Sequence, residues 1–436
     1  MTNRPARSLL TVLGVTFGLA VTIGNVIGAG IMRTPGDIAA KLPTFWPFIS
    51  VWIIGALYAM LGANALAELS AMTPRSGGQY VFVRRALGDY AGFIVGWSDW
   101  ISTCGTTAVV SMTLGEYAVK LMPSLPPVKG IALIVVAILT VVQWMGVRSG
   151  EVAQDITSAM KALALIALIV ACFWAGGRNP SGGGMEVERE LPLMAAFVLA
   201  LQAVIYTYDG WTAPIYFAGE VKNPGRDIPR SMFGGLALVT AIYLLINVAF
   251  VRVVPLATIA GEQLAAATVA RFLFGPSGYF IVLAIMIVGL LSAANSNVMM
   301  APRVVWAMGN DGLFWKGAQE VNAGGTPDIS LLISSAIAVA FIVTGTFETV
   351  LARIAYFFVA NYTLSFASLF VLRAREPQAE RPFRAKGHPV TTAIALLASL
   401  VFLVGAVISD PGNSWWALGL LAVSYPVYRL IRRDKA

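Results

Sequence analysis

The sequence predicts an all-α integral membrane protein with about twelve transmembrane helices. Of its 436 residues, 58% are hydrophobic and only 12% are charged, whereas an average soluble domain is about 25% charged. The mean hydropathy is +0.76, and the chain holds about twelve apolar segments of roughly 20 residues, the length that crosses a bilayer. So few polar residues cannot cover a water-facing surface, which excludes a soluble enzyme, a disordered regulator and a nucleic-acid binder.

The whole chain, residues 1–436, is expected to form a single membrane transport domain. The segment 256–272 is amphipathic and is expected to lie across an external loop. The first span follows Arg4 and Arg7 but is too long for a cleaved signal peptide, so we expect it to remain as a helix. The predicted spans are 13–33, 45–70, 90–119, 128–146, 154–176, 192–219, 231–254, 277–307, 328–346, 349–373, 389–409 and 413–430.

The distribution of basic residues predicts the orientation. With the N-terminus inside, 20 of the 30 Lys and Arg residues lie in cytoplasmic segments and 9 on the opposite side. Because cytoplasmic loops of membrane proteins are enriched in Lys and Arg, this bias predicts that both termini are cytoplasmic. The net charge of +8 therefore indicates orientation in a cell membrane rather than an anionic partner.

The sequence contains little that could serve catalysis or hold a cofactor. Cys104 and Cys172 both lie in apolar segments, and His388 is the single histidine. No metal site, serine–histidine triad or phosphate-binding loop is predicted, and we expect no cofactor.

Two predicted spans carry residues that interrupt a helix. The first contains Gly24, Gly28 and Gly30, and each Gly weakens a helix by about 1 kcal/mol relative to Ala. An alternative interpretation is that Gly24 and Gly28 form a small-residue packing face. The sixth span contains Asp209, Gly210 and Pro214. Asp209 would either cap a half-helix or contact a substrate, and both roles require a break there.

The two interruptions fall at corresponding positions, because spans one and six each begin a half of five helices. Five is odd, so the second half would be inverted in the membrane. Paired broken helices in inverted halves are typical of secondary transporters with a site at the membrane midplane. The unwound backbone would need partners that hydrocarbon does not offer, and a zwitterionic substrate supplies them.

Four segments resemble the amino acid–polyamine–organocation superfamily, and within it the L-type amino acid transporter branch. Residues 24–32 (Gly-Asn-Val-Ile-Gly-Ala-Gly-Ile-Met) are similar to its first-helix signature. Residues 208–211, 220–224 and 228–230 are similar to its sixth helix and following loop. Residues 74–80 and 303–327 also resemble segments of this superfamily. The resemblance implies a five-plus-five inverted repeat of the leucine-transporter type. Repeat one covers about 12–176, repeat two about 191–373, and two peripheral helices about 389–430.

The resemblance also implies site residues. Backbone N–H groups of Ala29, Gly30 and Ile31 would hold the substrate carboxylate. Carbonyls near Val26, Tyr206 and Asp209 would hold the amino group of the substrate. Tyr206 would also be the gate that closes over the substrate. The implied substrate-binding residues are Val26, Gly28, Ala29, Gly30, Ile31, Tyr206 and Asp209.

Lys161 lies within the fifth span, where an unpaired ammonium costs about 2.5–3.5 kcal/mol. It would either extend to the cytoplasmic interface, since the span is predicted to begin only a few residues earlier, or serve the coupling ion's role. In sodium-independent relatives, a Lys here replaces sodium and bridges the first-helix break to the eighth helix. Ser292 and Asn295 are its candidate neighbours, although interhelical hydrogen bonding is preferred for Asn295.

Other acidic residues in the spans are given structural roles. Glu68 is expected to pair with an Arg such as Arg75, and Asp99 is expected to be structural rather than to contact substrate.

The predicted function is sodium-independent transport of L-amino acids across the cytoplasmic membrane by alternating access. Exchange and proton coupling both remain open, so protons are a candidate partner besides the substrate and the bilayer. An amine or polyamine permease is the alternative within transport. A membrane-embedded enzyme or a channel is disfavoured, and the oligomeric state is left open.

Overall fold

The computed structural model describes residues 9–28, 30–174, 192–345, 347–409 and 411–433. The regular secondary structure of this part of the chain is helical, apart from an isolated bridge between Leu13 and Val221. Residues 175–191, which contain the predicted connection between the fifth and sixth spans, lie outside the described residues. The helices are α1 (Val15–Val26), α2 (Gly30–Lys41), α3 (Phe45–Met72), α4 (Gln79–Leu87), α5 (Asp89–Leu121), α6 (Val128–Trp144), α7 (Val147–Trp174), α8 (Leu193–Tyr208), η1 (Ala213–Phe217), α9 (Pro224–Val253), α10 (Leu256–Ile259), α11 (Ala265–Phe274), α12 (Pro276–Asn310), η2 (Lys316–Gln319), α13 (Asp328–Thr344), α14 (Phe347–Arg375), α15 (Val390–Ser409) and α16 (Pro411–Arg433).

Every predicted span coincides with a helix or a pair of helices, but length and composition alone support fewer spans than twelve. Six helical segments of the described chain are long and apolar enough to cross a membrane, and the bent pair α1–α2 makes a seventh. Helices α6 and α13 are apolar but shorter. Helix α5 is 33 residues long, yet it is rich in Ser, Thr and Gly. A helix buried among other helices need not be apolar on every side, which explains why α5 lacks the usual signal.

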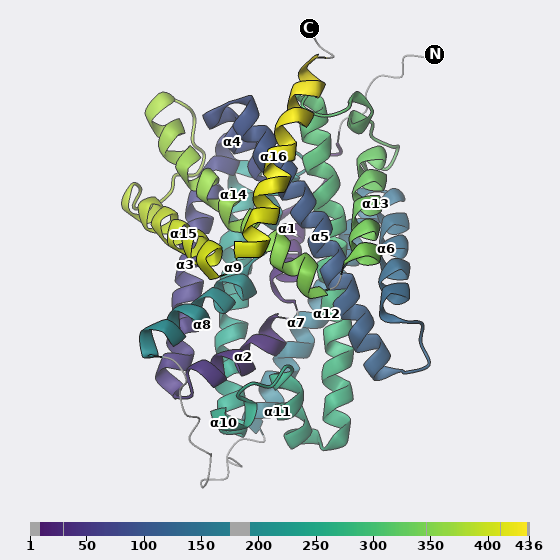
Figure 1. The fold of residues 1–436 in the computed structure, drawn as a ribbon, viewed down its shortest axis with the longest axis vertical. Helices are drawn as coiled ribbons and strands as arrows, with labels where there is room; N and C mark the ends of the chain where they lie inside the picture. The colour runs from purple at the N-terminus through teal and green to yellow at the C-terminus, as the bar shows by residue number, and fades with distance from the viewer. Residues whose placement is uncertain (1–8, 29, 175–191, 346, 410, 434–436) are drawn as a thin grey trace.

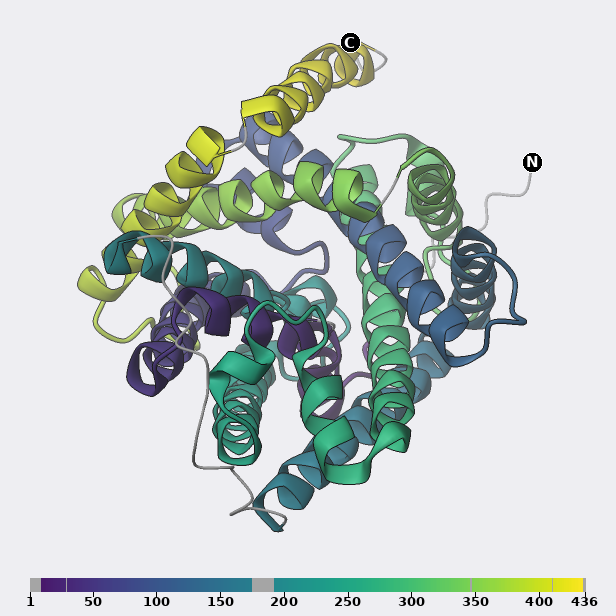
Figure 2. The ribbon, with the colours of Figure 1, turned by 60° about the horizontal axis from the view of Figure 1, so that its bottom comes forward.

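The helices form an elongated bundle with two distinct ends (Figure 1). We call the end that holds α4 and the C-terminal end of α16 the α4 end, and the opposite end, with α10 and α11, the α11 end. The amphipathic segment predicted at 256–272 forms α10 and α11 there. Helix α12 packs along α5 in the interior, while α1 packs on α7 and α9. Helices α15 and α16 lie at the edge of the bundle (Figure 2).

Some helix boundaries differ from the prediction. Helices α7 and α9 each begin seven residues before the predicted start of the span, at Val147 rather than 154 and at Pro224 rather than 231. Helix α4 was not predicted as a separate element, because its nine residues include Arg84 and Arg85 and are too short and polar for a span. It packs between α5 and α14 at the α4 end.

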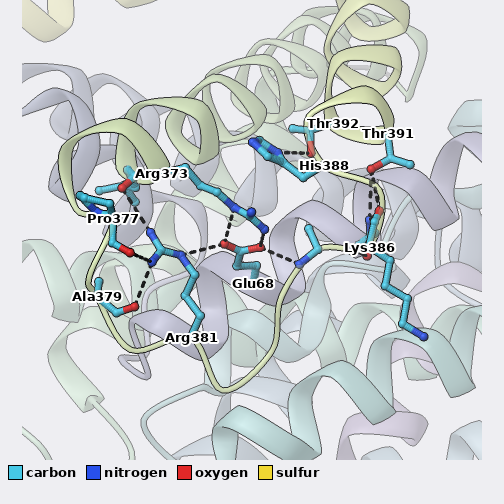
Figure 3. A network of polar contacts seen from close by, with 12 residues as sticks. Glu68, Arg373, Pro377, Ala379, Arg381, Lys386, His388, Thr391 and Thr392 are labelled. Carbon is cyan, nitrogen blue, oxygen red and sulfur yellow. Dashed lines mark hydrogen bonds and ion pairs between the residues drawn. The ribbon is translucent and has the colours of Figure 1, made fainter.

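The carboxylate of Glu68 is the centre of a charged network at the α4 end (Figure 3). It is fully buried and accepts hydrogen bonds from Arg373 at 2.9 and 2.6 Å, from Arg381 at 3.0 Å and from the N–H of Ala385 at 2.6 Å. Partial burial, together with the nearby guanidinium of Arg373, lowers the pKa of His388. A neutral ring at this position adds no positive charge to a cluster that already holds two guanidinium groups.

Glu68 thus pairs with arginines, as predicted, but Arg75 is not one of them. Arg75 instead pairs with Asp311 at 2.9 Å, and Asp311 also contacts Arg84 at 2.8 Å. Arg75 is close to Glu68 in sequence, but the end of α14 and the loop after it bring Arg373 and Arg381 to Glu68 instead.

A second ion pair at the α4 end is buried completely. Arg303 of α12 forms a bidentate pair with Glu220 at 2.6 and 2.7 Å, and the side chains are 2% and 0% exposed. The guanidinium also lies 4.4 Å from the ring centre of Phe217. This contact joins α12 to the segment that follows η1.

Replacing Arg303 by Met should lower thermal stability markedly. Removal of one partner of a buried ion pair leaves an uncompensated charge, at a cost of about 3–5 kcal/mol. The measurement is the unfolding midpoint of the purified protein in detergent. Arg226→Gln is the matched control, because Arg226 is 60% exposed in its pair with Asp227, and it should change the midpoint little. A double variant, Arg303→Met with Glu220→Met, should recover part of the loss; equal midpoints for all variants would contradict this account.

Candidate functional site

A cavity of about 350 Å³ lies where the two interrupted helices meet. Asn25, Val26, Gly28 and Gly30 line it from the first interruption. Tyr206, Thr207, Asp209 and Gly210 line it from the second. Side chains of α5, α12 and α14 complete the wall. Arg33 and Thr34 also line a second cavity of about 570 Å³ that holds charged residues near the α11 end, so the site continues in that direction.

The first interruption separates α1 from α2. Helix α1 ends at Val26, Ile27 leaves the helical conformation with φ −75° and ψ 88°, and α2 begins at Gly30. The two helices are inclined by 43°. The glycines have different roles: a Cβ at Gly24 would lie 1.8 Å from the side-chain nitrogen of Gln154, whereas a Cβ at Gly28 would meet nothing within 4 Å. Gly24 thus permits close packing on α7, and Gly28 borders the cavity.

The second interruption follows α8. The helix ends at Tyr208, Asp209 is extended with φ −58° and ψ 149°, and Gly210 has φ +108°. This left-handed conformation favours glycine. A Cβ at Gly210 would also lie 2.9 Å from the side-chain nitrogen of Asn25, so the two interruptions are in contact.

One hydroxyl group bridges both interruptions. The Tyr243 hydroxyl lies 2.8 Å from the carbonyl oxygen of Val26 and 3.2 Å from that of Thr207. A second link joins Thr34 and Thr207, whose hydroxyl oxygens are 2.8 Å apart. Side chains thus satisfy backbone carbonyls that the broken helices no longer satisfy, as a buried break requires.

Asp209 and Asp99 occupy different surroundings. The Asp209 carboxylate lines the cavity and accepts a hydrogen bond from the Tyr362 hydroxyl of α14. Asp99 is buried and accepts a hydrogen bond from Tyr216 at 2.7 Å, but it is not among the cavity-lining residues. The position of Asp99 agrees with the structural role expected for it.

Lys161 joins the first interruption to α12. Its ammonium donates to the carbonyls of Gly24 at 2.6 Å, Ile27 at 2.6 Å and Gly289 at 3.3 Å, and the residue is 1% exposed. Helix α7 begins at Val147, so Lys161 lies about 21 Å along it at about 1.5 Å per residue. A buried position at this depth is inconsistent with a side chain that extends to the interface.

Ser292 is close to Lys161 but is not one of its hydrogen-bond partners in the described structure. The Ser292 hydroxyl lies 3.0 Å from that of Ser158 and 3.2 Å from the amide nitrogen of Gln154. The residue of α12 that contacts the ammonium is Gly289, through its carbonyl. Asn295 forms interhelical hydrogen bonds, as expected, with Gln143 at 2.6 Å and Gln154 at 2.9 Å.

The remaining predicted site residues are placed as follows. Tyr206 lines the cavity and is 41% exposed. Gly30 lines the cavity beside Thr207. The Ile31 side chain is fully buried in the core and does not line it, so this residue could act only through its backbone. Ala29 lies outside the described residues.

Several cavity residues were not predicted. Asn297 of α12 donates to the side-chain oxygen of Asn25 at 3.1 Å, and Tyr362 contacts Asp209. Asn25 lies within the glycine-rich motif, so its polarity in an apolar span was a usable signal. Tyr362 gave no such signal, because a Tyr in an apolar helix is commonplace.

Replacement of Lys161 by Met should destabilise the protein. Three buried carbonyls would lose their shared donor, and a buried group without a partner costs about 1–3 kcal/mol. The unfolding midpoint in detergent measures the effect. The control is Lys129→Met, which removes an exposed Lys with a 2.8 Å bond to the Val343 carbonyl. Equal midpoints for the two variants would show that the carbonyls do not need the ammonium.

Comparison with known proteins identifies a family and several relatives of this chain. Residues 8–427 match the amino acid permease family. The chain is 28% identical to the serine/threonine exchanger SteT of Bacillus subtilis, over 97% of each chain. It is 27% identical to the human b(0,+)-type amino acid transporter 1, over 93% of this chain and 84% of that protein. It is 26% identical to the human large neutral amino acids transporter small subunit 2, over 96% and 80%.

These matches confirm the resemblance to the superfamily and to its L-type transporters, and the prediction that the chain is no enzyme. With a family match over nearly its whole length and two interrupted helices around a central cavity, the chain belongs to the amino acid permease family of the amino acid–polyamine–organocation superfamily and is a multi-pass membrane transporter of amino acids.

Proposed function

We propose that the protein exchanges L-amino acids across the cytoplasmic membrane by alternating access, without sodium. The observation that carries this proposal is the Lys161 ammonium, held by three backbone carbonyls at the junction of α1 and α12. Backbone carbonyls released by a broken helix are the groups that bind Na⁺ in transporters of this architecture. A fixed ammonium fulfils the same electrostatic role and leaves no need for the ion.

The substrate would lie between the two interruptions. Its carboxylate would accept hydrogen bonds from the first N–H groups of α2, near Gly28, Ala29, Gly30 and Ile31, since a helix N-terminus attracts an anion. Its ammonium would face the carbonyls of Val26 and of the end of α8, with the Asp209 carboxylate beside them. Each carbonyl can accept two hydrogen bonds. The existing bonds to Val26 from Tyr243 and to Tyr206 from the N–H of Asp209 therefore leave capacity for the substrate.

Tyr206 would be the gate. It belongs to the last turn of α8, borders the cavity and is 41% exposed, an exposure that leaves its ring room to move. The cavity continues toward the α11 end through Arg33 and Thr34. Buried and partly buried ion pairs of Glu68, Glu220 and Asp311 gather at the α4 end. This asymmetry favours a conformation that is open toward the α11 end.

The topology belongs to the proposal as well. Twelve spans would form two inverted repeats, about 12–176 and 191–373, followed by peripheral helices within 389–430, all in one domain. Interruptions near residues 27–28 and 209–212, at corresponding positions of the halves, support the repeat. The α4 end would be cytoplasmic with both termini, because the loops that carry most Lys and Arg residues lie there.

Exchange is preferred to proton coupling because the relative matched over almost the whole chain is named an exchanger. Its printed name also makes serine and threonine the first substrates to test. The cavity offers hydroxyl and amide groups, among them Thr103, Thr106 and Asn297, that would suit a short polar side chain.

Uptake in proteoliposomes should be independent of sodium and depend on an internal amino acid. Radiolabelled L-serine uptake should be unchanged when sodium is replaced by choline, and several-fold faster into liposomes loaded with L-serine or L-threonine than into empty ones. Sodium-dependent uptake would refute the role given to Lys161. Uptake into empty liposomes driven by a pH gradient would favour proton coupling over exchange.

Replacement of Asp209 by Asn should raise the KM for L-serine about tenfold. A hydrogen bond to a charged group contributes about 1.5–3 kcal/mol, and each 1.4 kcal/mol is about a factor of ten. Glu380→Gln, an exposed change in the loop after α14, is the control and should leave KM unchanged. Competition by ethanolamine, which is serine without its carboxylate, tests the other half of the site. Competition as strong as that of serine would exclude a carboxylate site and favour an amine permease.

A further inference from the structure

A third cavity, larger than both of those described above, lies on the outside of the bundle, away from the substrate site. It measures about 770 Å³ and is bordered by α5, α13, α16 and the segment that leads into η2. Four of the eleven tryptophans of the chain line it. We call it the tryptophan groove and define it by Trp97, Trp100, Phe314, Trp315, Phe341 and Trp416.

The groove is built into the structure rather than left between loosely packed helices. The Trp100 indole N–H donates to the Ser334 hydroxyl of α13 at 2.9 Å, and its ring packs edge-on against Phe314 at 5.4 Å. Trp97 packs against Trp100 at 5.9 Å. Ordered rings thus form the floor, whereas Trp315 at the rim is 60% exposed and Trp416 is partly exposed. Exposed aromatic surface on this scale is suited to contact with lipid.

The shape of the groove suits a chain rather than a compact ligand. Trp416 and Ile431, which both border it, lie about 22 Å apart along α16 at about 1.5 Å per residue. One leaflet of the hydrocarbon layer is about 15 Å deep. The groove therefore extends along the full depth of the leaflet at the α4 end and reaches its interface. Figure 2 shows α16 at the edge of the bundle, where lipid has access.

A single cation lies at the interfacial end of the groove. Lys316 borders the cavity, is exposed, and forms no ion pair within the described part of the chain. It follows α12 and the Asp311 turn, at the same end as α4. Among the residues that the structure describes, no acidic side chain borders the groove. An apolar channel that ends at an ammonium complements an acyl chain that ends at an anionic headgroup.

We propose that the tryptophan groove binds an anionic phospholipid of the leaflet at the α4 end. One acyl chain would lie along the aromatic floor, and the phosphate group would contact Lys316. The site is separate from the substrate cavity, because the two share no lining residue among those that the structure describes.

Native mass spectrometry of the full-length protein, released from detergent with added lipid, tests this proposal. The probes are palmitoyl-oleoyl phosphatidylglycerol and palmitoyl-oleoyl phosphatidylcholine, and the measured quantity is the dissociation constant of the first retained lipid. The wild-type protein should bind the glycerol lipid about fivefold more tightly, as expected for one Lys near an anionic headgroup. Lys316→Gln should abolish this preference. Lys222→Gln, an exposed Lys at the same end but outside the groove, should keep it.

A groove-filling variant tests the acyl-chain part. Ile337→Trp places a large ring in the groove and should weaken binding of both lipids about tenfold or more. Leu332→Trp adds the same ring on the exposed face of the same helix and should have no effect. Unfolding midpoints and amino acid uptake of both variants establish that they are folded. Equal affinity of the wild type for the two lipids, equal behaviour of the two Lys variants, or unchanged binding by a folded Ile337→Trp protein would each overturn the proposal.

Discussion

The structure depends on one constraint: backbone groups released by a break in a buried helix must find partners inside the protein. The break after α1 releases the carbonyls of Gly24 and Ile27, and Lys161 donates to both of them. The Val26 carbonyl between them accepts from Tyr243. One ammonium and one hydroxyl therefore stabilise an interruption that hydrocarbon would not tolerate.

This constraint extends into the packing of the surrounding helices. On α7, the side chains of Gln154 and Ser158, which precede Lys161, contact Ser292 of α12. Ser158 also donates to the Ala20 carbonyl of α1 at 2.8 Å. Gly24 has no room for a side chain because Gln154 lies against it. Three helices are thus joined by a continuous polar layer, and each buried polar group in it is hydrogen-bonded.

Charge is distributed unevenly between the two ends of the bundle. At the α4 end, Glu68 and Glu220 are fully buried, and each is held by at least one Arg. Near the α11 end, Arg33 and Glu116 are 3.8 Å apart and about one-third exposed. A buried pair must be complete because a lone charge is costly there, whereas an exposed pair contributes little. The tight contacts therefore lie at one end, and the continuous cavity lies toward the other.

Much of the fold could be predicted from local sequence features. Glycine-rich and Asp-Gly segments cannot continue an apolar helix at low cost, so both interruptions were located from the sequence. Apolar runs located the twelve predicted spans to within a few residues for most helices. The prediction failed for α4, which is short and polar, and for the starts of α7 and α9, whose first turns carry charged residues and do not look like a span.

The sequence by itself determined which residues are exceptional: a Lys and an Asp in apolar spans, and glycines where a helix must end. These follow from composition and local propensity, which act over a few residues. Only the tertiary structure decided the partners. Glu68 pairs with Arg373 and Arg381 rather than Arg75, and the ammonium of Lys161 meets Gly289 rather than Ser292. Such pairs join residues more than 100 positions apart, and their geometry depends on how helices pack, which no local pattern encodes.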